Sequence, residues 1–157
     1  MPRPVVTLRA YRPEDLETLY RIDQECYLRG IAYSRRTLHA FVTLPETECL
    51  VAEAAGEIVA FIMTEAEGLR AHIITIDVIE AHRRGGLGSV LLAEAEQRLI
   101  TRGVRQVELE TAQDNAAAVA FWHARGYRTR GVLKNYYLGR IDAFYMDKAL
   151  PAPTEKP

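Results

Sequence analysis

The chain has 157 residues, of which 48% are apolar and 26% charged, and its formal net charge is −1. This length suits one ordinary domain, and the composition excludes disordered, collagen-like and coiled-coil chains. The charge does not indicate general nucleic-acid binding, and two cysteines make neither a disulfide framework nor a metal site. The longest nearly apolar run, at 58–64, is far below the roughly 20 residues that span a bilayer. No signal peptide is recognisable, so we expect a cytoplasmic protein without membrane contact.

Periodicity, caps and turn residues predict the secondary structure. In chain order we expect a strand at 5–10, a helix from 13 to about 26, a helix capped by Ser34, strands at 48–54 and 57–64 joined at Ala55-Gly56, a strand at 71–79, a helix at 89–102, a strand at 104–110, a helix capped by Asp114 or Asn115 and running to 125, and strands at 127–132 and 141–148. This order predicts a mixed sheet with helices on its faces, of the α/β or α+β class, with a right-handed crossover at 71–110. Residues 1–150 are expected to form one domain, and the proline-rich tail 151–157 to be disordered.

A glycine-rich turn, Arg83-Arg84-Gly85-Gly86-Leu87-Gly88, separates the most apolar strand from a good helix. Glycines let a ligand approach the backbone, and the following helix offers unpaired N–H groups and a positive dipole end. The turn therefore predicts an anion site suited to phosphate. It is not a P-loop, because no Gly-Lys-Ser/Thr follows, and Leu91 breaks the dinucleotide fingerprint.

The turn resembles the acetyl-CoA pyrophosphate loop of the GNAT N-acetyltransferase superfamily, through Arg83-x-x-Gly86-x-Gly88. Residues 115–127, Asn-Ala-Ala-Ala-Val-Ala-Phe-Trp-His-Ala-Arg-Gly-Tyr, resemble its second CoA helix. Glu110, the segment 135–137 and the segment 142–146 resemble the branch that contains the ribosomal-protein alanine N-acetyltransferases. The resemblance is strong over 71–148 and loose over 1–70.

The resemblance implies a single-domain, splayed mixed sheet of about seven strands, with about four helices on both faces. It places acetyl-CoA between the strands that end near Val78 and Glu110. The pantetheine arm is then expected to pair with backbone groups of Ile76 and Val78, and the pyrophosphate with amides of residues 84–88. The residues expected to bind the cofactor are Ile76, Val78, Arg83, Arg84, Gly85, Gly86, Leu87, Gly88, Ser89, Asn115 and Trp122.

Acetyl transfer to an amine needs a neutral nucleophile, so a positioned base is expected. Glu110 is the first candidate, by position and by resemblance, and Glu108 on the same strand face competes with it. Asp77 lies among apolar residues, where an acid must be paired or face the active-site cleft; it binds the incoming ammonium, shares the base role, or forms a salt bridge to a helix. His72 faces away from Thr75 and Asp77 and is interpreted as structural.

Aromatic residues are the candidates for the remaining roles. Trp122 stands where the family usually has a tyrosine acid; indole cannot donate that proton, so Trp122 packs in the core or contacts the cofactor. Tyr136 or Tyr137, in the connection before the last strand, is expected to replace the acid, with Tyr137 preferred, and both are expected to line the acceptor site. Tyr27 and Tyr33 border the same groove by resemblance, although Ala32-Tyr33-Ser34 replaces a Pro-Trp-Ser common in the ribosomal-protein enzymes.

The predicted activity is acetyl-CoA-dependent N-acetylation by direct attack of the amine in a ternary complex, with no metal. A protein N-terminal α-amine is the expected acceptor, and a lysine or small amine the alternative. A non-catalytic acyl-CoA sensor and a nucleotide-binding module are the competing functions. An enzyme, unlike a sensor, is expected to keep a carboxylate of raised pKa at position 110. The oligomeric state is expected to be a monomer or homodimer.

Overall fold

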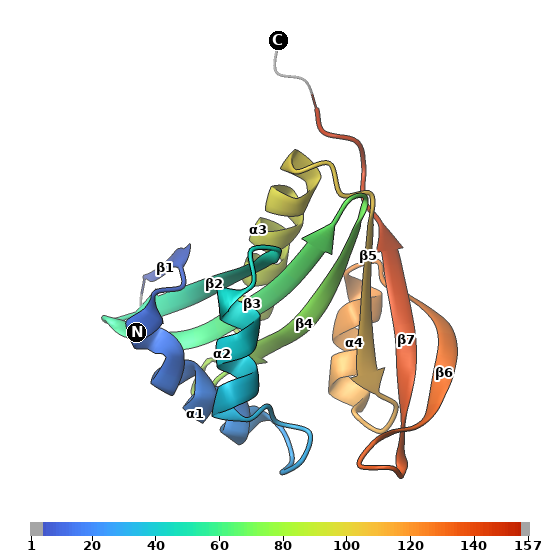
Figure 1. The fold of residues 1–157 in the computed structure, drawn as a ribbon, viewed down its shortest axis with the longest axis horizontal. Helices are drawn as coiled ribbons and strands as arrows, with labels where there is room; N and C mark the ends of the chain where they lie inside the picture. The colour runs from blue at the N-terminus through green and yellow to red at the C-terminus, as the bar shows by residue number, and fades with distance from the viewer. Residues whose placement is uncertain (1–4, 155–157) are drawn as a thin grey trace. The chain divides into compact units, whose positions relative to one another are not determined.

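A computed structural model describes residues 5–154 and contains, within that range, seven β-strands and four α-helices (Figure 1). The sheet is mixed and has the strand order β1-β2-β3-β4-β5-β7-β6, which confirms the predicted fold class. No helix in this range has both the length and the apolarity to cross a membrane. The elements are β1 (Val6–Ala10), α1 (Leu16–Cys26), α2 (Arg35–Thr43), β2 (Thr47–Ala54), β3 (Glu57–Glu67), β4 (Arg70–Val78), α3 (Leu87–Thr101), β5 (Gln106–Ala112), α4 (Ala116–Ala124), β6 (Arg128–Tyr137) and β7 (Ile141–Ala149).

The chain divides into two compact units, and the division falls inside β3, β4 and α3. Unit 1 runs up to Glu65 and includes Ile74–Gln97, whereas unit 2 comprises Ala66–Ile73 and the chain from Arg98 onward. The single domain at 1–150 stays a prediction. In the predicted tail, residues 151–154 form neither helix nor strand, and residues 155–157 lie outside the described residues.

Unit 1 places α1 and α2 on one face of its strands and α3 on the other (Figure 1). The two front helices are amphipathic, and their apolar faces bury Leu19 and Leu38 completely against Val51 and Phe61 of the sheet. A fully buried side chain of this kind contributes about 1.5–3 kcal/mol to the free energy of unfolding. This core holds the end of α1 and the segment that follows it against β4.

Helix-capping residues and a tight turn, as predicted from the sequence, determine where these helices and strands begin or end. The Ser34 hydroxyl accepts the N–H of Thr37 at 3.1 Å and caps α2. The β2–β3 hairpin turns at Ala55 and Gly56, whose φ angles of 52° and 80° are those of a tight turn with two left-handed central residues. At the start of α4, Asn115 is the cap, since its side-chain oxygen accepts the N–H of Ala118 at 3.1 Å.

Unit 2 is built on β5, which pairs in parallel with the start of β4 and antiparallel with β7. Burial alternates along β5: Val107 and Leu109 are buried, whereas Glu108 and Glu110 lie on the other face. The helix α4 covers one face of the strands β5, β7 and β6 (Figure 1). The alternation therefore leaves two carboxyl groups on one face of a central strand.

Strand β6 is longer than predicted and ends at Tyr137 rather than near Val132. Its pairing with β7 shifts register between Leu133 and Tyr137. Within the shift, Asn135 has a φ of 54°, and its backbone N–H donates to Asp142 Oδ1 at 2.9 Å. Tyr136 and Tyr137 thus belong to a bulged strand and not to a connection, because asparagine tolerates the left-handed conformation that the bulge needs.

Candidate active site

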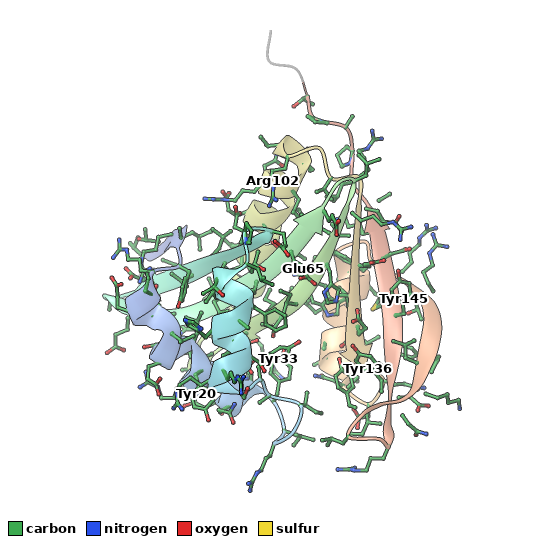
Figure 2. The ribbon with its side chains drawn as sticks, viewed as in Figure 1. Tyr20, Tyr33, Glu65, Arg102, Tyr136 and Tyr145 are labelled. Atoms are coloured by element: carbon green, nitrogen blue, oxygen red, sulfur yellow. The ribbon has the colours of Figure 1, made fainter. Side chains whose placement is uncertain are left out.

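Three side chains of unit 2 meet at Glu110, and we call His72, Glu110 and Tyr136 the Glu110 cluster. His72 Nε2 lies 2.9 Å from Glu110 Oε2 and 3.1 Å from Oε1. The Tyr136 hydroxyl donates to Glu110 Oε1 at 3.1 Å. The three residues come from β4, β5 and β6, and Figure 2 labels Tyr136 in this unit.

The register of the strands explains why these side chains meet. In the parallel pair, His72 stands opposite Glu108, so Glu110 is the next residue along on the same face. Tyr136 reaches this face from the bulged end of β6. A histidine, a carboxylate and a phenol are thus in contact, although the three residues lie far apart in the sequence and form no sequence motif.

Two donors keep the Glu110 carboxyl ionised. Partial burial alone would raise its pKa, but the hydrogen bond and charge of His72, with the Tyr136 hydroxyl, outweigh burial and lower the pKa below its usual value. Reciprocally, burial and the carboxylate raise the pKa of the Tyr136 phenol. The expectation of a raised pKa at Glu110 is therefore wrong in direction, because it left out the donors that the fold supplies.

The neighbouring candidates have partners of their own. Glu108 accepts a short hydrogen bond from the Tyr145 hydroxyl of β7, a residue also labelled in Figure 2. Tyr137 packs edge-on against Tyr136 with ring centroids 4.8 Å apart. The phenol that reaches Glu110 is thus that of Tyr136, whereas Tyr137 was the preferred catalytic tyrosine. The catalytic roles of both tyrosines stay predictions.

Asp77 lies in unit 1, inside a contact with helix α1. Asp77 and Asp23 are 1% and 0% exposed, and the Asp23 carboxyl is near enough to raise the pKa of the Asp77 carboxyl; we call the two groups the carboxyl pair. Thr75 Oγ1 donates to Asp77 Oδ1 at 2.5 Å, and the Tyr33 N–H donates to Asp23 Oδ2 at 2.6 Å. Burial first, and then Asp23, raise the pKa of Asp77 well above its usual value. Instead of a salt bridge to a helix, the structure shows two acids in contact.

A proton is required between these acids. Within the described chain, Asp77 Oδ2 and Asp23 Oδ1 are buried and meet no N–H or O–H donor. Two ionised carboxylates would leave both oxygens unsatisfied, which is costly in the interior. A proton retained on Asp77, whose pKa is raised, supplies the donor that these oxygens lack. That arrangement favours a structural role for Asp77 over substrate binding.

Side chains from the end of α1 and the segment after it cover carbonyl groups of β4. The Tyr27 hydroxyl donates to the Ile76 carbonyl at 3.1 Å, and the Tyr33 hydroxyl makes a longer contact of 3.5 Å with the Ile74 carbonyl. Ile76 is one of the two residues predicted to pair with pantetheine, and the carbonyl of the other, Val78, accepts from Arg83 Nε at 2.9 Å. Any ligand pairing at these carbonyls must share or displace a side-chain donor.

The turn before α3 is open to solvent. Residues 83–86 are exposed, α3 begins at Leu87, and Gly86 has a φ of 82° with nothing within 4 Å of the position a Cβ would take. Arg84 also adopts a left-handed φ of 65°. Exposed amides, a helix N-terminus and the charge of Arg84 fit a diphosphate. Arg83 turns back toward β4, while Gly85, Gly88 and Ser89 lie in the turn or the first turn of α3.

The two residues predicted to contact the cofactor from α4 have clear structural roles. Asn115 caps the helix, as described above. Trp122 is 5% exposed and packs edge-to-face against Phe121 and Tyr127, with ring centroids 5.0 and 5.2 Å away. Its indole stabilises the seam between α4 and the sheet of unit 2.

Two partners of the candidate residues, His72 and Asp23, were not predicted from the sequence. The interpretation of His72 as structural overlooked that, in parallel strands, it shares a face with Glu110, a signal available from strand parity. Asp23 follows Leu19 by four residues and so lies on the buried face of α1, which marks it as an acid in need of a partner. That the partner is a second acid could not be read from spacing.

Comparison with known proteins assigns the family. Residues 16–127 match the acetyltransferase (GNAT) family. The [ribosomal protein bS18]-alanine N-acetyltransferase of Escherichia coli K12 is 31% identical over 153 residues, covering 92% of this chain and 97% of the relative. A crystal structure of the Escherichia coli ribosomal-protein-S18-alanine N-acetyltransferase superposes with a TM-score of 0.87 at 27% identity, covering 98% and 99% of the two chains. Ard1 from Thermoplasma volcanium gives 0.85 at 29% identity, covering 93% and 98%. The chain belongs to the GNAT family of acetyltransferases and is an N-acetyltransferase.

Proposed function

We propose that the protein transfers the acetyl group of acetyl-CoA to the N-terminal α-amine of a protein or peptide. The observation that carries the proposal is the ionised Glu110 carboxylate, held by His72 and Tyr136. A fixed negative charge attracts an ammonium group and favours loss of its proton to a nearby base. Tyr136 and Tyr137 provide aromatic surface for the residues that follow the amine.

The exposed turn at 83–88 would hold the diphosphate of acetyl-CoA. Its residues offer backbone N–H groups at the start of a 15-residue helix, and Arg84 adds a positive charge. Gly86 leaves the backbone accessible, because a side chain there would project into the open space beside the amides. When bound, acetyl-CoA supplies an activated carbonyl carbon and a thiolate that leaves readily.

The pKa of the acceptor favours an α-amine over a lysine. A free α-amine has a pKa of about 7.7–8.0 and lysine about 10.4, so neutralising lysine costs about 3–4 kcal/mol more. The lowered pKa of the Glu110 carboxyl makes this group a weak proton acceptor. A site of low basicity suits the amine that loses its proton more easily.

An acceptor panel tests the proposal. Purified protein is mixed with acetyl-CoA and peptides that have a free N-terminus and no lysine, or a blocked N-terminus and one internal lysine, and thiol release and product mass are measured. We expect turnover with the free N-termini, and a loss of about 10²–10⁴-fold in kcat/KM for Glu110→Gln. Turnover confined to lysine or to small amines would replace the proposed acceptor, and acetyl-CoA binding without thiol release from any amine would favour a sensor.

A further inference from the structure

We propose that Arg83 is a positioning residue. It holds the turn at 83–88, which we call the phosphate turn, against β4 and α1, and it does not itself bind the diphosphate. This inference rests on the proposed function, since it concerns the turn that would hold acetyl-CoA. It changes the expectation from the sequence, in which both Arg83 and Arg84 bind the cofactor.

Three contacts join Arg83 to the end of β4 and to the end of α1. The Arg83 Nε donates to the carbonyl oxygen of Val78 at 2.9 Å, and its Nη2 donates to Cys26 Sγ at 3.5 Å. The Cys26 thiol in turn donates to the same carbonyl oxygen, also at 3.5 Å. We call Arg83, Val78 and Cys26 the Arg83 brace. Two of the guanidinium nitrogens are therefore engaged with the protein rather than with an anion.

Cys26 suits its place in the brace because its thiol stays neutral at neutral pH. Burial first, and then the charge of Asp77, raise the pKa of this thiol to about 11, although Arg83 acts in the opposite direction. A neutral thiol donates through its S–H and accepts at sulfur, so it can bond the carbonyl and the guanidinium together. The brace therefore joins the turn, β4 and α1 without an ion pair, and its effect depends on geometry.

Arg84, the next residue, is placed differently. It is exposed, and its side chain makes no hydrogen bond or ion pair with any residue in the described range 5–154. Its φ of 65° is left-handed, a conformation that few residues other than glycine adopt, whereas Arg83 is extended with a φ of −72° and a ψ of 156°. An unpaired guanidinium beside exposed amides suits a diphosphate, so the two adjacent arginines have different roles.

The phosphate turn needs an anchor because glycine leaves its backbone flexible. Gly86 has a φ of 82° and nothing within 4 Å of its Cβ position, so no neighbouring side chain packs there to fix the turn. At the C-terminal end of the turn, Leu87 begins α3 and is only 7% exposed, which fixes this end to the core. Arg83 supplies the corresponding anchor at the N-terminal end. Amides that are already held in place bind an anion more tightly than amides that binding must first order.

Calorimetric binding of 3′-phospho-ADP, which carries the diphosphate of CoA without its pantetheine, separates a positioning residue from a phosphate ligand. We expect Arg83→Lys to raise the Kd about 3–10-fold, because lysine keeps the charge but cannot span Val78 and Cys26 together. Cys26→Ala should raise the Kd by a similar factor, although it removes no charge, and Cys26→Ser, which keeps a donor and an acceptor, should lie nearer to wild type. Arg36→Lys, at an exposed position of α2, is the matched control and should bind as wild type.

A second measurement needs no ligand. The heteronuclear NOE of the Gly86 amide reports fast backbone motion, and it should fall in Arg83→Lys and Cys26→Ala but not in Arg36→Lys. A wild-type Kd in Arg83→Lys or in Cys26→Ala overturns the positioning role, and so does a Gly86 NOE that is the same in all variants. If the wild type binds neither 3′-phospho-ADP nor acetyl-CoA, the proposed function fails, and the NOE still decides whether Arg83 holds the turn.

Discussion

Replacing Asp77 by asparagine should make the protein more stable, and by more as the pH rises. In the wild type, the folded state keeps the proton of the carboxyl pair, whereas the unfolded chain releases it above a pKa of about 3.9. A raised folded-state pKa contributes stability that is complete below the unfolded pKa and is lost as pH rises toward the folded pKa. Asparagine supplies a permanent N–H donor to Asp23 Oδ1 and releases no proton on unfolding.

The expected magnitude follows from one proton. The difference in unfolding free energy between Asp77→Asn and wild type should grow by about 1.4 kcal/mol per pH unit, or about 2.7 kcal/mol between pH 5 and pH 7. For a chain of this length, that growth widens the difference in Tm by roughly 5–10 °C. Urea unfolding at fixed pH values, with the Tm as a second reading, measures it.

The other titrating groups around the pair do not interfere in this window. Burial raises the pKa of Cys26 to about 11, and burial also raises the pKa values of Tyr27 and Cys49. All three groups stay neutral between pH 5 and pH 8. Asp114→Asn, an exposed acid before α4, is the control and should show no growing difference. A difference for Asp77→Asn that stays constant from pH 5 to pH 8 would refute the proton retained on Asp77.

Two substitutions test the phosphate turn and the core. Gly86→Ala places a side chain at a φ of 82° and should cost about 1–2 kcal/mol in unfolding free energy while raising the KM for acetyl-CoA. The matched Gly131→Ala, also with open space but without a positive φ, should leave that KM unchanged, and equal KM values for both variants would contradict the assignment of the turn. Phe61→Ala, at a fully buried position, should lower the unfolding free energy by about 3–5 kcal/mol in urea titrations, and a loss below about 1 kcal/mol would contradict its place in the core.

Much of the fold could be predicted because its signals are local. Ser34 and Asn115 are capping residues, the Ala55-Gly56 turn sits between two alternating segments, and the buried positions of β5 alternate. Each of these features depends only on residues that are close together in the sequence. The family resemblance supplied the splayed mixed sheet, which local signals do not contain, whereas the strand order comes from the structure.

The candidate site was harder to predict because it depends on register. Tyr136 and Tyr137 are adjacent and chemically identical, so residue type cannot choose between them. The register shift around Asn135 decides which hydroxyl reaches Glu110. A shift of one residue exchanges the two faces of a strand, and no alternation pattern in β6 announces it. The lowered pKa of the Glu110 carboxyl is likewise a property of the assembled strands.

Counting every acid as ionised gives the chain a formal net charge of −1 at pH 7. The raised pKa of Asp77 favours a protonated carboxyl in the folded molecule, so folding makes the molecule less negative than the unfolded chain. Net charge contributes to the long-range repulsion between copies of a protein in solution. A buried side chain thereby takes part in how the surface behaves toward its own copies.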